Sequence, residues 1–325
     1  MTERSSQLQN KDSHPHPLAI FLMGPTASGK SDVAWKIAER LPVEIVSVDS
    51  AQVYRHMDIG TAKPDAKTRA ALPHHLIDLL EPHERYSAAR FVDDALAAMR
   101  EITRHGNTPL LVGGTMLYFR ALLEGLSELP PADSGLRGEI EAKAEKAGWP
   151  AVHEELQRLD PSSAARIHPT DSQRIQRALE VCYISGKPMS EVLKTRRVPR
   201  LPYRIAHIAL VPGDRTLLHQ RIAQRFDEML ELGLIDEVQT IRDKFPVNDA
   251  SPSMRCVGYR QIWMYLSGRI NSAEMRQMAL AATRQLAKRQ LTWLRPMEEI
   301  KEFDCLGNNL PEQILKYLAT CGAHI

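Results

Sequence analysis

The sequence has few cysteines and no long apolar run, and both absences narrow the class of protein. The cysteines form no C-x-x-C pair and have no histidine ladder nearby, which argues against a zinc site and a disulfide framework. No apolar stretch approaches the length of a membrane span. Residues 1–16 are polar and lack the apolar core of a signal peptide, so we expect a disordered tail and a cytoplasmic protein. The cysteines, which we expect to be reduced, are Cys182, Cys256, Cys305 and Cys321.

The sequence also lacks a large net charge. Its 42 lysines and arginines nearly balance 40 acidic residues, so net charge alone does not indicate a nucleic-acid partner. The charges are unevenly distributed, however. Residues 166–204 hold nine basic against three acidic side chains, and residues 253–296 hold eight against one. Such stretches are typical either of a nucleic-acid face or of an ordinary solvated basic surface, and composition does not separate the two.

A phosphate-binding motif follows the apolar run 18–23, which is predicted to be a buried strand. Its glycines allow backbone N–H groups to point at one anion, and the helix that follows adds partial positive charge. Lys30 adds a full charge, and the Ser31 hydroxyl is a candidate ligand for Mg²⁺. The pattern does not say which phosphate is bound. The predicted phosphate-binding residues are Gly24, Pro25, Thr26, Ala27, Ser28, Gly29, Lys30 and Ser31.

Strands alternating with helices predict an α/β fold, a doubly wound parallel sheet like that of P-loop NTPases. We expect further strands at 43–48, 76–80, 110–112 and 204–211, and helices at 31–40 and from Ser87 to Gly106. Asp49 follows the second strand, where ligands of parallel sheets collect, although it could instead cap a short helix. Thr115 ends a Gly-Gly-Thr turn at the same edge and is equally a candidate helix cap or substrate contact.

The strand pattern stops over residues 126–200, which predicts an all-helical insertion between a first core part, 17–125, and a second, 201–325, with C-terminal helices. Helices are expected at 136–147, 151–159 and 171–185. For the third helix we expect a capping box of Thr170 with Gln173 and a glycine stop at Gly186. Gln173, Arg174 and Arg177 lie off its apolar face and form either a binding surface or a solvated edge.

The second core part has three groups of basic residues. Arg221 and Arg225 lie one helical turn apart and form either a phosphate clamp or ion pairs with neighbouring acids. Residues 255–260 form a loop that mixes basic and aromatic side chains. A long helix is predicted from Asn271 to about 295, with basic residues near one face.

Taken together, these segments resemble the tRNA dimethylallyltransferase family, over nearly the whole chain and in the bacterial form, because no C-terminal zinc finger is present. The ordered set of motifs is more specific than the phosphate-binding motif alone. The motifs are GPTASGKS at 24–31, DSAQVYRHMDIGTAKP at 49–64, PHHLID at 73–78, VGGTMLYFRALLEG at 112–125, DSQRIQRALE at 171–180, RCVGYRQ at 255–261 and ATRQLAKRQLTWLR at 282–295.

The resemblance implies a prenyltransferase that binds dimethylallyl diphosphate in the phosphate-binding motif of residues 24–31, hereafter the cradle. It also implies that the adenosine immediately 3′ of the anticodon is flipped into a channel. It implies Asp49 as the base for the adenine amine, with Lys30, Thr115 and Arg221 as further catalytic residues and Mg²⁺ at Ser31. The tRNA anticodon stem-loop is the implied partner of a monomer that does not bind membranes. The implied tRNA contacts are Asp49, Ser50, Ala51, Gln52, Thr115, Arg137, Gln173, Arg174, Ile175, Gln176, Arg177, Arg255, Cys256, Val257, Gly258, Tyr259 and Arg260.

Two other readings fit parts of the sequence. A P-loop kinase for a small molecule would use Asp49 as base and Arg221 with Arg225 as a clamp. It has no need of the helical insertion or of the two basic stretches. A non-catalytic RNA-binding module would not need Lys30, Ser31 and Asp49 together.

Overall fold

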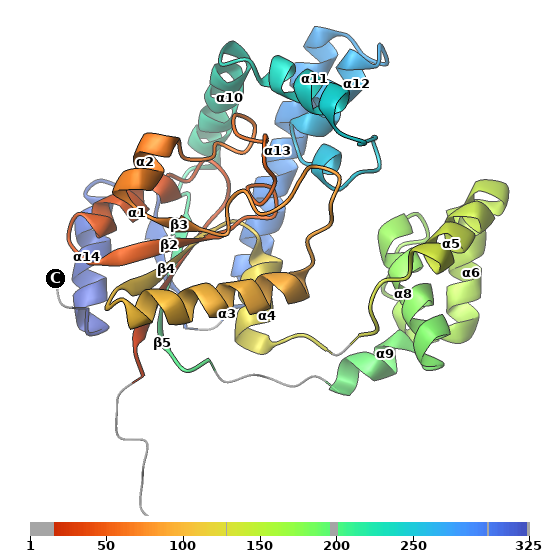
Figure 1. Cartoon of the computed structure of the whole chain (residues 1–325), viewed down its shortest axis with the longest axis horizontal. Coiled ribbons are helices and arrows are strands. Elements are labelled where there is room, and N and C mark those ends of the chain that lie inside the picture. The colour runs from red at the N-terminus through yellow and green to blue at the C-terminus, as the bar shows by residue number, and fades with distance from the viewer. Residues whose placement is uncertain (1–15, 128, 196–200, 298, 324–325) are drawn as a thin grey trace, which may run out of the picture. The chain divides into compact units, whose positions relative to one another are not determined.

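The computed structural model describes residues 16–127, 129–195, 201–297 and 299–323. Most of the tail predicted over 1–16 therefore lies outside the described residues. The chain forms two compact units, one made of residues up to Phe119 and from Leu201 onward, the other of Arg120–Arg200 (Figure 1).

The first unit is built on a parallel sheet of six strands in the order β3-β2-β4-β1-β5-β6. The strands that bear the cradle and Asp49 are buried along almost their whole length, as expected for a parallel sheet covered on both faces. At the carboxyl edge of the sheet, Met23 of β1 pairs with Gly113 of β4 and with Ala209 of β5, and Gly113 also pairs with Val48 of β2. The loops that follow these strands therefore meet at this edge. The strands are β1 Leu18–Met23, β2 Val43–Val48, β3 His74–His75, β4 Thr108–Gly113, β5 Arg204–Val211 and β6 Lys301–Asp304.

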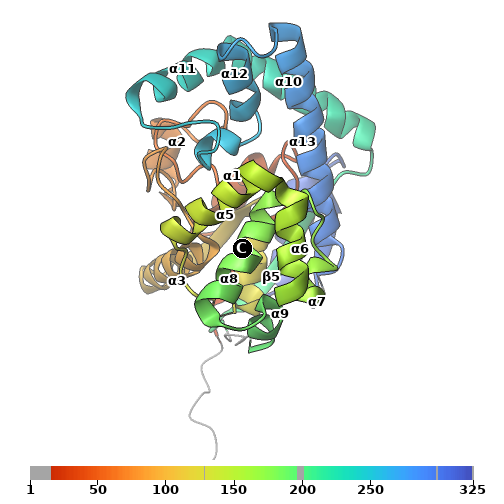
Figure 2. The ribbon, with the colours of Figure 1, turned by 90° about the vertical axis from the view of Figure 1, so that its right-hand side faces the viewer.

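Helices cover both faces of the sheet. Alternate residues of β1 point to opposite faces, so Ile20 and Leu22 pack in one core with α1 and α14. Phe21 faces the other way and lies 5.3 Å from Phe119 of α4, ring centre to ring centre. Four further helices, α10 to α13, form a second core with the loop after β2, and Figures 1 and 2 show them grouped together. The helices are α1 Lys30–Ala38, α2 Ala66–Ala71, α3 Ala88–Arg104, α4 Met116–Glu124, α10 Arg215–Glu231, α11 Leu234–Lys244, α12 Tyr259–Leu266, α13 Ser272–Leu294 and α14 Leu310–Thr320.

The prediction of a strand over 76–80 is wrong. Only His74 and His75 pair with β2, because Leu76 and Asp78 adopt positive φ angles of 64° and 56°, which extended strands exclude. The helix predicted from Ser87 is confirmed, since the Ser87 side chain accepts the Arg90 N–H at its first turn. Strands β2, β4 and β5 are confirmed as well.

The described residues of the second unit form helices joined by loops, with no strand among them. Its core is formed by apolar side chains of α5, α6 and α8, among them Ile140, Leu156 and Leu179. The predicted capping box is wrong, because Asp171, not Thr170, caps α8 by accepting the Arg174 N–H. Gly186 ends that helix with a φ of 66°, as predicted. The unit contains α5 Ser134–Ala147, α6 Trp149–Leu159, α7 Pro161–Ala164, α8 Ser172–Ser185 and α9 Met189–Val192.

Candidate active site

A cavity of about 970 Å³ opens at the carboxyl edge of the sheet in the first unit. Its walls come from segments far apart in the sequence, among them the cradle, the loop after β2, the turn after β4, α10, the segment at the start of α12, and one side of α13. The lining residues include Thr26 to Ser31, Asp49 to Gln52, Gly60 to Ala62, Gly113 to Leu117, Arg225, Arg255 to Tyr259, Arg289, Gln290 and Trp293.

The cradle geometry requires glycine at two positions. A Cβ on Gly24 would lie 2.9 Å from both the Leu210 carbonyl oxygen and Ser28 Oγ, closer than real Cβ contacts. Gly29 has a φ of 79° and is the N-cap of α1 without any side-chain cap. The first N–H groups of α1 are thus available to an anion in the cavity, as in other phosphate-binding turns.

Lys30 lies across the cradle, where its Nζ donates to the carbonyl oxygens of Gly24 at 3.0 Å and Pro25 at 2.6 Å. Burial, and after it the positive charge of Arg225, lowers the pKa of Lys30 to about 8, although the Asp49 carboxylate acts in the opposite direction. An anionic ligand in the cradle would stabilise the charged lysine. The site therefore has a cation whose charge depends on what is bound.

Asp49 caps the turn that follows β2. Its Oδ1 accepts the N–H groups of Ala51 at 2.8 Å and Gln52 at 3.4 Å, so a capping role is real, although for a turn rather than a helix. Among the described residues, no group donates a hydrogen bond to Oδ2. The Gln52 side chain continues the turn by accepting from Ser47 Oγ at 2.8 Å and donating to the Thr61 carbonyl at 3.2 Å.

Gln290 on α13 joins the cradle to the turn after β4. Its Oε1 accepts the Thr26 N–H at 2.9 Å, and its Nε2 donates to the Gly114 carbonyl at 2.9 Å. Thr115 then extends the link, because its Oγ1 accepts the Ser50 N–H at 3.1 Å. One buried amide and one hydroxyl thus hold the ends of β1, β2 and β4 together.

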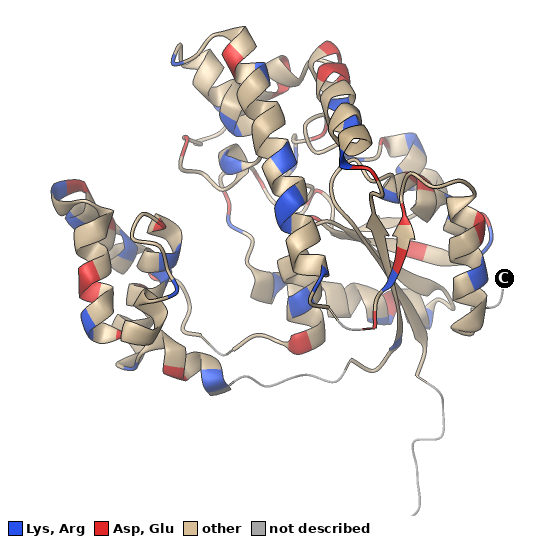
Figure 3. Ribbon diagram, turned by 180° about the vertical axis from the view of Figure 1, so that it is seen from behind, with Lys and Arg blue, Asp and Glu red and all other residues tan. Residues whose placement is uncertain are grey.

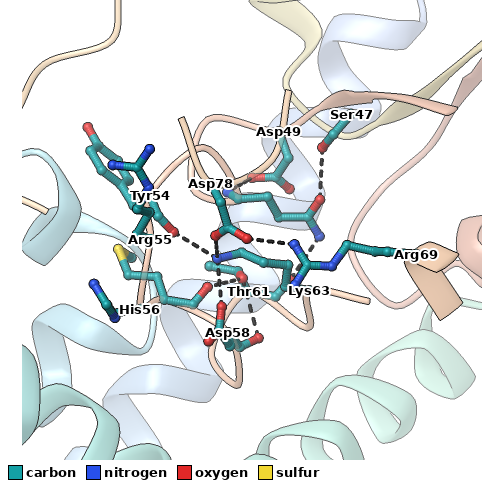
Figure 4. Close-up of polar contacts among 12 residues, drawn as sticks. Ser47, Asp49, Tyr54, Arg55, His56, Asp58, Thr61, Lys63, Arg69 and Asp78 are labelled. Carbon is teal, nitrogen blue, oxygen red and sulfur yellow. Dashed lines mark hydrogen bonds and ion pairs between the residues drawn. The ribbon is translucent and has the colours of Figure 1, made fainter. Parts of the chain in front are cut away.

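A second polar network shapes the loop after β2 (Figure 4). Lys63 is almost fully buried and donates to the Tyr54 carbonyl at 2.8 Å and to Asp58 and Asp78 at 2.7 Å each. Arg69 donates to the other oxygen of Asp78 at 2.6 Å. Burial favours the neutral Asp78 carboxyl, but the bonds from Lys63 and Arg69 outweigh it and lower its pKa. Lys63 therefore organises this loop instead of facing the cavity.

Comparison with known proteins decides the family. A family model described as "IPP transferase" matches residues 52–297, and a model described as "Isopentenyl transferase" matches residues 18–74. The "tRNA dimethylallyltransferase" of Nitrosospira multiformis is 68% identical over 95% of both chains, and that of Nitrosomonas eutropha is 62% identical over 93% of this chain and 95% of its own. The chain belongs to the tRNA dimethylallyltransferase family.

Solved structures agree with this assignment. The full-length tRNA isopentenylpyrophosphate transferase from Bacillus halodurans is 36% identical with a TM-score of 0.68, covering 94% of this chain and 96% of its own. A eukaryotic dimethylallyltransferase acting on tRNA has a TM-score of 0.75 at 26% identity and covers 94% of this chain and 79% of its own. The resemblance, the P-loop-like α/β fold and the prenyltransferase class are confirmed, and no comparison supports a kinase.

Most of the residues predicted to bind the donor or to take part in catalysis line the cavity, but Arg225 takes the place predicted for Arg221. Arg221 is exposed and does not line the cavity, whereas Arg225, one turn later, lines it and is partly buried. Gln290 and Arg289 were missed by the sequence reasoning. The signal for Gln290 was present, since it lies on the seam of buried α13 residues between Ala287 and Leu294, where a polar side chain needs a partner.

The predicted residues of the second unit divide into outward and inward groups. Gln173 and Arg174 are exposed, while Ile175 belongs to the core. Arg137 binds the fully buried Glu180 through two hydrogen bonds, at 2.8 and 3.0 Å. Arg177 binds the same carboxylate and the carbonyl oxygen of residue 130. Burial opposes the ionisation of Glu180, but both arginines outweigh it and lower its pKa.

Basic side chains recur along α13, the long central helix of Figure 3, with few acidic ones. Arg284, Lys288, Arg289 and Arg295 are exposed, and Arg289 also lines the cavity. Over the described ranges, no helix has both the length and the apolar character needed to cross a membrane.

Proposed function

We propose that this chain transfers the dimethylallyl group of dimethylallyl diphosphate to the exocyclic amine of the adenosine immediately 3′ of the anticodon in tRNA. One observation carries the proposal: a single cavity holds both an anion cradle with Lys30 and a strand-end carboxylate, Asp49, that acts electrostatically on that lysine. A transfer reaction that releases diphosphate needs a group that stabilises the leaving anion and a group that removes a proton from the nucleophile.

The cradle is the proposed donor site. As the bond between the allylic carbon and the diphosphate oxygen breaks, negative charge grows on the diphosphate. The N–H groups at the start of α1, Lys30 and Arg225 are in position to stabilise it. We assign to Arg225 the clamp role predicted for Arg221, because Arg225 lines the cavity and its charge acts on Lys30.

Mg²⁺ fits this site as a shared ion. The Ser31 hydroxyl, in the first turn of α1, and the carboxylates of Asp32 and Asp49 all belong to residues that line the cavity. The described residues contain no cluster of three or more acidic, histidine or cysteine ligands, so the ion would take its remaining ligands from diphosphate and water, as Mg²⁺ commonly does. When bound, it would neutralise charge on the diphosphate.

Proton removal from the acceptor is assigned to Asp49, and the apolar lining of the cavity to the prenyl group of the donor. The adenine nitrogen forms its bond to the allylic carbon while its proton moves to Oδ2 of Asp49, the oxygen not used by the turn. Ile222, Phe226 and Val257 line the cavity and suit an apolar five-carbon group. Burial, followed by the charge of Asp49, raises the pKa of Cys256 to about 12, so this thiol stays neutral beside the reacting groups.

The anticodon stem-loop is the proposed partner of both units. Exposed Arg174 on α8 and the exposed basic residues of α13 support contacts with phosphates, while Arg137 and Arg177 support the fold of the second unit through Glu180. We further propose that the protein acts in the cytoplasm as a monomer.

Label transfer tests this function. Donor labelled in the prenyl group and ATP labelled in the γ-phosphate are incubated separately with the protein and a tRNA anticodon stem-loop. Prenyl label is expected in the RNA, and none in a stem-loop that carries inosine, which lacks the exocyclic amine, at the target position. Phosphate transfer from ATP, or no prenyl transfer to the adenosine substrate, would overturn the proposal.

A further inference from the structure

Glu237 accepts four hydrogen bonds from two distant segments of the chain. It lies in the first turn of α11, in the sequence GLIDEV at 233–238. Its Oε2 accepts the N–H groups of Asp58 at 2.9 Å and Ile59 at 2.7 Å, and its Oε1 accepts the Gly60 N–H at 3.2 Å. The Tyr259 hydroxyl donates to the same Oε1 at 2.5 Å.

Consecutive backbone N–H groups that converge on one point form a site for an anion. At residues 58–60 that anion is the carboxylate of Glu237 itself. These N–H groups are therefore occupied by the protein, and the segment is held to α11 and to Tyr259 at the start of α12. Charge-assisted bonds of this kind are roughly twice as strong as neutral ones.

The two segments also touch directly. A Cβ on Gly60 would lie 2.5 Å from Tyr259 Cε2 and 2.8 Å from Leu234 Cδ1, so the backbone at Gly60 approaches the tyrosine ring closely, where a side chain has no room. Both segments line the cavity, one through Gly60 to Ala62 and the other through Arg255 to Tyr259. Within the described ranges, no hydrogen bond links Glu237 to the cradle. The cradle is instead held by Gln290 and by the pairing of β1, the strand that precedes it, with β4.

We propose that Glu237 is a positioning residue for the tRNA acceptor. It fixes the spacing between the loop after β2, 49–64, and the segment 255–260, whose last two residues start α12 and are not in the loop predicted from the sequence. It so fixes the surface that the flipped adenosine and its neighbours meet. The inference rests on the proposed function and on the tRNA contacts that the family resemblance implies for Asp49 to Gln52 and Arg255 to Arg260 in these two segments. Because Glu237 does not contact the cradle, its loss affects the tRNA side selectively.

Glu237→Gln tests the proposal with little change in side-chain volume, since the amide keeps one acceptor oxygen but loses the charge. We expect KM for tRNA to rise by about tenfold to a hundredfold, the scale of a lost charge-assisted hydrogen bond, with KM for the donor within about twofold of the parent. Asp236→Asn is the matched control, because it removes one exposed charge from the same helical turn and leaves all four bonds in place.

Tyr259→Phe provides a second measurement that does not disturb the carboxylate or the ring contact. It removes one of the four bonds, so a smaller rise in KM for tRNA is expected, and the two rises should not be additive when it is combined with Glu237→Gln. A fall in kcat with both KM values unchanged, or an equal rise in both, would mean that Glu237 only supports the fold, and the proposal would be wrong. If Glu237→Gln does not fold, an unaltered KM for tRNA in Tyr259→Phe overturns it. Absence of transfer by the parent protein would instead overturn the proposed function.

Discussion

Replacing Asp49 by asparagine separates the two roles that its carboxylate oxygens have. Oδ1 holds the turn after β2 by accepting the Ala51 and Gln52 N–H groups, and an asparagine Oδ1 accepts the same bonds. The amide group takes the place of Oδ2, which is the oxygen assigned to the proton. The substitution therefore removes the base and keeps the local structure.

The size of the effect follows from this division. A positioned general base contributes about a hundredfold to ten-thousandfold, so single-turnover transfer should fall by that factor in Asp49→Asn. The capping bonds remain, so unfolding free energy should change by less than about 1 kcal/mol. One indirect effect is expected, because the Asp49 charge raises the pKa of Lys30, and its loss lowers that pKa further below about 8.

The assay is accordingly run near pH 6.5, well below the pKa of about 8 of Lys30 in the parent, with tRNA and donor saturating. Binding of each substrate is measured separately and should stay within a few-fold of the parent. A transfer rate within a few-fold of the parent, in a folded variant, would refute the assignment. The proton would then pass to water or to the diphosphate, and Asp49 would serve the turn alone.

Three further outcomes are expected. The pKa of Lys30, about 8, lies below its unfolded value of 10.5. Donor affinity should therefore be constant below pH 8 and fall by up to about tenfold per pH unit above it, because the lysine loses its charge. Calorimetric titration of Lys30→Ala should not find this dependence. Arg174→Ala should lower tRNA affinity and reduce the slope of its salt dependence by about 0.7 per lost phosphate contact, without changing stability. Arg177→Ala removes a charged partner of a buried carboxylate and should lower the unfolding free energy by about 1.5–3 kcal/mol in urea titrations. Gln290→Met should leave the partly buried Thr26 N–H and the buried Gly114 carbonyl unpaired and lower the unfolding free energy by about 1–3 kcal/mol. Gln277→Met, at an exposed position of the same helix, should not.

The fold was predictable where periodicity was strong and uninterrupted. The apolar runs of β1, β2 and β5 and the capped, amphipathic α3 have local signals that agree with their tertiary surroundings. The segment 76–80 is apolar too, yet it is not a strand. Its conformation depends on Lys63 and Arg69, which bind Asp78 from outside the segment, and no local pattern contains that information.

The site was predictable in its motifs but not in the contacts between them. Arg221 and Arg225 are alike in sequence, and only the packing of α10 decides which one faces the cavity. The pairing of Gln290 with the cradle spans 264 positions in the chain. The four bonds of Glu237 are equally non-local. Such contacts depend on the folded arrangement, so a sequence read segment by segment does not reveal them.

The place of β1 in the sheet has a consequence for synthesis of the chain. β1 pairs with β4 on one side and with β5 on the other, and β5 is translated only after the whole second unit. While the ribosome makes residues 120–200, the edge of β1 that later pairs with β5 has no partner. Residues 19–23 of this strand are all fully buried in the finished protein. Exposed apolar strand edges of this kind promote aggregation, so slow translation through the helical unit, or a stop within it, should increase the demand for chaperones.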